Sequence, residues 1–251
     1  MPRNLKLTLA YDGHDFAGWQ VQPDCVTIQG TLVSVFEHLT GEKTLPQGSG
    51  RTDAGVHALA QTASVAIESP IPVANLVRAL NNLLPQSIRV LAVEEMPPEF
   101  HARKSAVAKT YQYRIFRDEI CPPFLARYVF HHPYPLDEAR MAQAAAIVEG
   151  EHDFTSFAAV DPERNREGEE VNNVRTIYHS AWQRQGNELL YTVRGNGFLH
   201  HMVRNLVGTF LMVGKGSLKI EDVRRILDLR DRSAAAATAP ASGLFLVSVE
   251  Y

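Results

Sequence analysis

Hydrophobic and polar residues follow regular spacings along most of the chain, and the spacing predicts the type of each element. Leucines alternate with polar residues over 5–9, which is the period of a strand with one buried face. Behind Thr27, a good N-cap, apolar residues recur at helical spacing: Ile28, Leu32, Val35, Phe36 and Leu39. A strand over 61–67, a helix carrying Leu76 and Leu80, and a strand over 88–93 follow. The first half is predicted to run strand, helix, strand, helix, strand.

The second half opens in the same order, with a strand over 110–116 and a helix over 137–148 that Asp137 caps. Gly186 and Asn187 form a short turn that suits a hairpin between two further strands. The remaining expected elements are a helix over 199–213, a helical stretch over 221–229 and a closing strand over 244–249.

These patterns predict an α+β fold. Each half resembles the split βαβ, ferredoxin-like arrangement, in which helices cover one face of an antiparallel sheet. We expect an N-terminal half over residues 1–105 and a C-terminal half over 106–251, although the two share no detectable sequence identity. The segment 161–172, rich in Glu, Arg and Asn and without periodicity, is expected to be a mobile surface insertion.

Composition narrows the class of protein. The 251 residues carry 28 acidic and 25 basic side chains, a formal charge of -3, so an RNA partner would have to bind a local patch rather than a global positive field. Cys25 and Cys121 match no metal-ligand spacing. The N-terminus lacks the apolar run of a signal peptide, and no stretch of about 18 apolar residues occurs. We therefore expect a cytoplasmic protein with no membrane partner.

The densest chemical signal is the run from Gly48 to His57, in which three glycines surround one carboxylate, Asp53. Glycines let a backbone turn tightly and leave space for a ligand. Composition alone slightly favours a structural loop in which Asp53 caps backbone amides and Arg51 is a solvated charge.

The sequence GRTDAGVHA over 50–58 resembles the active-site motif of the TruA-type tRNA pseudouridine synthases. The resemblance continues through five further segments: 11–13 with 18–20, 100–103, 109–113, 153–157 and 200–205. It implies two ferredoxin-like halves whose sheets join side by side around a central catalytic cleft. It also implies a homodimer that modifies uridines at tRNA positions 38 to 40, in the anticodon stem-loop.

The resemblance also assigns roles. Asp53 would be the covalent nucleophile, attacking either C6 of the uracil or C1′ of the ribose. Arg204 would be its counter-ion, against the alternative of a solvated helix residue. Tyr111 would stack on the flipped base, and Arg51 would occupy the space that the base leaves. Leu244 would be an apolar wall of the pocket, although a simple core residue fits the sequence equally well.

No metal or cofactor is expected. The pairs at 131–132 and 200–201 are adjacent histidines, whose side chains diverge on a helix or a strand, and no HxxxH pattern accompanies them. No phosphate-binding glycine motif occurs. We expect His57 and His101 to orient the catalytic loop or to contact phosphate. Basic residues near the aromatic strand favour RNA contact or a solvated face: Arg103, Lys104, Lys109, Arg114 and Arg117.

Two other functions remain open. A noncatalytic RNA-binding module would explain the basic strand but not a single carboxylate in a glycine-framed turn. A hydrolase of the glycosidase type would need a second acid at a suitable separation, for which Asp12 and Asp153 are the candidates.

Overall fold

The leucine alternation at the N-terminus forms β1 (Arg3–Tyr11), in which Leu5, Leu7 and Leu9 are fully buried. The protein is described by a computed structural model over residues 2–160 and 172–251. Of the polar segment expected to be an insertion, all but Asn172 lies outside these residues. Two units make up the chain: the first contains residues up to 107 together with 245–251, and the second contains residues 108–244.

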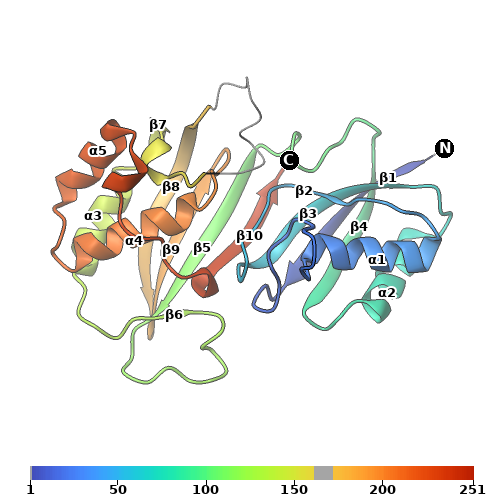
Figure 1. Ribbon diagram of the computed structural model, residues 1–251, viewed down its shortest axis with the longest axis horizontal. Coiled ribbons are helices and arrows are strands. Elements are labelled where there is room, and N and C mark those ends of the chain that lie inside the picture. The colour runs from blue at the N-terminus through green and yellow to red at the C-terminus, as the bar shows by residue number, and fades with distance from the viewer. Residues whose placement is uncertain (1, 161–171) are drawn as a thin grey trace. The chain divides into compact units, whose positions relative to one another are not determined.

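The first unit follows the predicted order. After β1 come α1 (Ile28–Thr40), a short β2 (Gln47–Gly48), β3 (His57–Ile67), α2 (Val73–Leu83) and β4 (Ile88–Met96). Thr27 caps α1 as predicted, because its Oγ1 accepts a hydrogen bond from the Gly30 amide. The strands lie in the order β4-β1-β3-β10, and α1 and α2 cover one face of this sheet (Figure 1).

The last strand is β10 (Leu244–Glu250), which the sequence predicts as a closing strand over 244–249. We expected it within the C-terminal half over 106–251, whereas residues 245–251 group with the first unit. The reason is a pairing that periodicity does not reveal: β10 runs parallel to β3, with Phe245 opposite His57. The terminal Tyr251 then donates a hydrogen bond from its hydroxyl to the carbonyl of Ala102, over 2.9 Å.

The second unit contains an antiparallel sheet in the order β5-β9-β8-β7. Its strands are β5 (Ala108–Phe116), β7 (Gly150–Asp153), β8 (Val174–Gln185) and β9 (Glu188–Gly195), and the short β6 (Phe130–His131) runs parallel to β5. The predicted hairpin joins β8 to β9, with Gly186 at a φ of 55°. Short strands β2, β6 and β7 were not predicted.

The described residues of the second unit also form three α-helices: α3 (Glu138–Ala146), α4 (Met202–Gly214) and α5 (Ile220–Leu229). Asp137 caps α3 as predicted, accepting from the Arg140 amide at 3.0 Å. Figure 1 shows α3 and α4 against one face of the sheet, where Phe210 of α4 meets Tyr191 of β9 edge to face. The α+β prediction is therefore confirmed in both units. Among the described residues, no helix is long and apolar enough to cross a membrane.

Candidate active site

Asp53 lies on the loop that joins β2 to β3, where a sharp turn begins. The amide of Val56 donates to the carbonyl of Asp53 at 3.1 Å, and Gly55 has a φ of 77°, which glycine adopts without strain. At the other end of the loop, the amide of Ser49 donates to the carbonyl of Thr62 at 2.7 Å. The Asp53 side chain is half-buried and Arg51 is exposed. The loop backbone therefore presents both side chains from a fixed turn.

The segment from Asp12 to Cys25, which follows β1, supports this loop from within the first unit. The Trp19 amide donates to the Thr52 carbonyl at 3.0 Å. Gly18 has a φ of 93°, and a Cβ added there would lie 2.6 Å from the same carbonyl oxygen. A Cβ on Gly13 would lie 1.9 Å from the carbonyl oxygen of Val56. The segments 11–20 and 50–58, about thirty residues apart in the sequence, thus pack closely against each other. Glycine allows this close approach because it has no Cβ.

His57 is a buried part of the same structure. Its side chain is 1% exposed, its ring stacks on Phe245 at a centroid distance of 4.7 Å, and its Nδ1 accepts a hydrogen bond from the Gly13 amide. Of the two roles expected for it, loop orientation fits this environment better than phosphate contact. His101 stabilises the turn that follows it, because its Nδ1 accepts a hydrogen bond from the amide of Arg103 at 3.1 Å.

Tyr111 and Leu244, two of the other expected site residues, lie in the second unit. Tyr111 on β5 is 7% exposed, and its ring meets Phe198 edge to face at 5.0 Å. Tyr113, on the same face of β5, is fully buried and donates its hydroxyl to the Pro240 carbonyl, while burial raises its pKa. That environment fits the structural role expected for Tyr113. Leu244 is buried at the start of β10.

Arg204 lies in the first turn of α4, where its Nε donates to the carbonyl of Ala239 at 2.8 Å. The amide of Ala239 in turn donates to the carbonyl of Arg204 at 3.1 Å. The guanidinium also lowers the pKa of Tyr113, against the larger effect of burial. Arg204 is half-buried rather than fully solvated, so the alternative of a purely solvated helix residue does not describe it.

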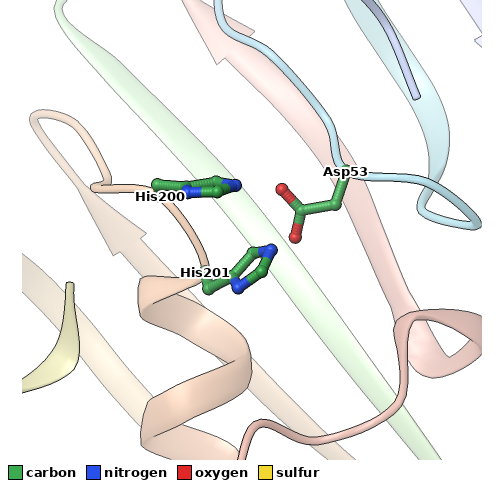
Figure 2. A group of neighbouring side chains, drawn as sticks. All are labelled: Asp53, His200 and His201. Atoms are coloured by element: carbon green, nitrogen blue, oxygen red, sulfur yellow. The ribbon is translucent and has the colours of Figure 1, made fainter. Parts of the chain in front are cut away.

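The histidine pair before α4 differs from the arrangement expected for adjacent histidines. Adjacent histidines were expected to diverge, yet the ring centroids of His200 and His201 are 4.0 Å apart, with 40° between their planes. His201 has a φ of 58°, outside both helix and strand, and this backbone turns the two side chains to the same side. Figure 2 shows the pair at the start of α4.

The two candidate second acids of the hydrolase hypothesis have local partners. Asp153 Oδ1 accepts from the amide and the hydroxyl of Thr155, and its Oδ2 lies 3.2 Å from Arg230 Nε. Asp12 Oδ1 accepts from the His14 amide at 3.0 Å. Both carboxylates therefore help to fix turns, which weakens the case for either as a free catalytic acid.

Comparison with known sequences identifies the family. The sequence model of the tRNA pseudouridine synthases matches residues 8–103 and 144–251, which is most of the chain. The chain belongs to the tRNA pseudouridine synthase family. Membership makes it an enzyme of the isomerase class. Arg51, Asp53, Arg204 and Leu244 lie within the matched parts, whereas Tyr111 lies between them.

Full-length relatives cover nearly the whole chain. The tRNA pseudouridine synthase A of Solibacter usitatus is 56% identical over 250 residues, which are 99% of this chain and 100% of that protein. The tRNA pseudouridine synthase A of Latilactobacillus sakei is 43% identical and covers 100% of both chains. That of Moorella thermoacetica is 44% identical, over 98% of this chain and 99% of that protein.

The site also contains two residues for which the sequence predicts no role. Gln61 on β3 and Tyr11 at the end of β1 are buried, and their polar atoms bond to the Asp53 loop. Their signal in the sequence is weak. Gln61 is a polar residue within a largely apolar strand, which indicates a buried polar group only once the strand's buried face is known.

Proposed function

We propose that this protein isomerises uridine to pseudouridine in tRNA, with the Asp53 carboxylate as covalent nucleophile. The reaction breaks the N1–C1′ bond, turns the uracil, and joins C5 to C1′, while the proton lost from C5 is balanced by one gained at N1. A nucleophile is needed, but no oxidant or reductant. The observation that carries the proposal is the rigid, glycine-framed loop that presents Asp53 within the family's motif.

The other site residues receive roles from the same resemblance. Arg204 would hold Asp53 ionised, which a neighbouring cation favours. Tyr111 would stack on the extruded base, and its hydroxyl would assist removal of the C5 proton. Arg51, exposed beside Asp53, would fill the space left in the RNA. Leu244 would be an apolar wall of the base pocket.

The proposal extends to the substrate and the assembly. The relatives named tRNA pseudouridine synthase A support tRNA as the substrate. The resemblance points further, to uridines at positions 38 to 40 of the anticodon stem-loop and to a homodimer. A cytoplasmic location, expected from the sequence, is compatible with a tRNA substrate. Homo-oligomers of this kind are normally twofold symmetric.

Tritium release from tRNA labelled at uridine C5 tests the nucleophile. Asp53→Asn should fold normally and release no tritium. Asp153→Asn is the matched control: it changes a carboxylate that fixes a turn in the second unit and should retain activity. Full turnover by Asp53→Asn would rule out the mechanism. Loss of activity in both variants would instead favour a pair of acids.

A second variant tests the counter-ion. Arg204→Met should depress kcat more than tRNA affinity, because the proposed role of the guanidinium is to stabilise the ionised nucleophile. Equal losses in kcat and affinity would indicate phosphate binding instead.

A further inference from the structure

The amide of Gln61 is a buried polar group with partners on the catalytic loop. The side chain is 0% exposed on β3. Its Oε1 accepts hydrogen bonds from Ser49 Oγ at 2.7 Å and from the Thr62 amide at 3.1 Å, and its Nε2 donates to the Gly50 carbonyl at 3.0 Å. A buried amide is costly unless both its ends are bonded, and here both are. Gln61 thereby fixes the start of the loop, two residues before Thr52.

The hydroxyl of Tyr11 extends this network to the residue before Asp53. Tyr11 is 4% exposed, and its hydroxyl oxygen lies 2.8 Å from Thr52 Oγ1 and 3.5 Å from Gln61 Nε2. Burial raises the pKa of Tyr11 to about 12, still further above neutral pH than its usual value, and the protonated hydroxyl is able to donate a hydrogen bond. The Trp19 amide holds the Thr52 carbonyl at the same time. Thr52 is thus held by both its side chain and its backbone.

Every one of these bonds lies within the first unit, and together they fix Gly50 and Thr52, the residues on either side of Arg51. We propose that Gln61 and Tyr11 are positioning residues, which act through Gly50 and Thr52 to hold the Asp53 carboxylate in the orientation needed for attack. The inference rests on the proposed function of Asp53. Apolar residues of similar shape would fill a purely structural core about as well, so a fully bonded polar network at this place fits a positioning role.

Hydroxyl and amide deletions at the two positions test the proposal by steady-state tritium release. Tyr11→Phe and Gln61→Met keep the packing volume and remove the bonds. Misplacing a catalytic group by about 1 Å costs up to roughly a hundredfold, so kcat should fall about tenfold to a hundredfold with the KM for tRNA within about twofold. A wild-type kcat in Tyr11→Phe would overturn the proposal, as would a matching rise in KM.

The second unit offers a matched control for lost stability. Tyr191 is also fully buried, and its hydroxyl lies 2.8 Å from Ser180 Oγ, the same bond that Tyr11 makes to Thr52. Tyr191→Phe should lower the urea midpoint about as much as Tyr11→Phe and leave kcat unchanged. An equal fall of kcat in both variants would mean that the Tyr11 hydroxyl matters only for folding, against the proposal.

Changes at Thr52 decide whether Tyr11 acts through this side chain. Thr52→Ser keeps the hydroxyl and should retain most of the activity, whereas Thr52→Val should lower kcat as Tyr11→Phe does. The double variant Tyr11→Phe/Thr52→Val should be no slower than either single variant, because each substitution removes the same hydrogen bond between the two hydroxyls. Losses that multiply would overturn the proposal.

Asp53→Asn in the same assay separates this inference from the proposed function. If Asp53→Asn retained activity, Asp53 would not be the nucleophile, and the positioning role proposed for Gln61 and Tyr11 would fall with it. An inactive Asp53→Asn beside a fully active Tyr11→Phe and Gln61→Met would overturn the positioning role alone.

Discussion

Gly18→Ala should impair catalysis far more than a glycine substitution with equal backbone strain elsewhere. Gly18 has a φ of 93°, and a left-handed φ costs a residue with a Cβ about 1–2 kcal/mol. The new Cβ would also lie 2.6 Å from the Thr52 carbonyl oxygen and 3.1 Å from the Ala54 amide, on either side of Asp53. Relieving such an overlap costs typically about 1–3 kcal/mol, so the free energy of unfolding should fall by roughly 2–5 kcal/mol in total.

Gly41→Ala is the control. Gly41 ends α1 with a φ of 77°, and an added Cβ would meet nothing within 4 Å. The free energy of unfolding of Gly41→Ala should therefore fall only by the cost of the left-handed backbone, about 1–2 kcal/mol. Urea denaturation measures the stability of both variants, and tritium release at a temperature where both stay folded measures kcat. A Gly18→Ala enzyme whose kcat falls no more than that of Gly41→Ala would refute the claim that these loops hold the nucleophile in place.

Three further predictions concern stability. Phe210→Ala should cost about 3–5 kcal/mol in urea denaturation, because the ring is fully buried, and a loss below about 1 kcal/mol would contradict the described core. Thr27→Ala should cost about 1 kcal/mol by removing the cap of α1, with Thr27→Ser nearly neutral. Burial, then Lys215 and Arg117, lowers the pKa of His132, so the unfolded chain binds the proton more readily. The contribution of His132 to stability should therefore be full above about pH 6.5 and be lost as the pH falls below it. The free energy of unfolding should fall less steeply with falling pH in His132→Gln than in the wild type, and equal slopes would show that His132 does not cause the dependence.

The elements with a clear period were predictable from the sequence. Alternation from Leu5 to Leu9 gave β1, and helical spacing behind Thr27 gave α1, because burial of one face leaves a trace in the residue order. The short strands β2, β6 and β7 leave no such trace, since two to four residues are too few to establish a period. The parallel pairing of β10 with β3 was not predictable either, because it joins residues about 190 apart.

The residues of the candidate site also differ in how far the sequence predicts them. Asp53 and Arg51 were predictable because they lie in a contiguous motif, and Arg204 was predictable from its own segment over 200–205. The bonds of Gln61 and Tyr11 were not, since they depend on which strand faces meet beneath the loop. The paired rings of His200 and His201 depend on one backbone torsion, the positive φ of His201, that no residue preference of histidine dictates.

The central claim, that the Asp53 carboxylate bonds covalently to the target uridine, is tested most directly by trapping. A tRNA with 5-fluorouridine at the target position lacks the C5 proton that must leave, so an adduct formed before that step should persist. Mass spectrometry of the digested complex locates the attachment. We predict an adduct on the peptide that contains Asp53, absent from Asp53→Asn. An adduct on any other residue, or one that Asp53→Asn still forms, would contradict the claim.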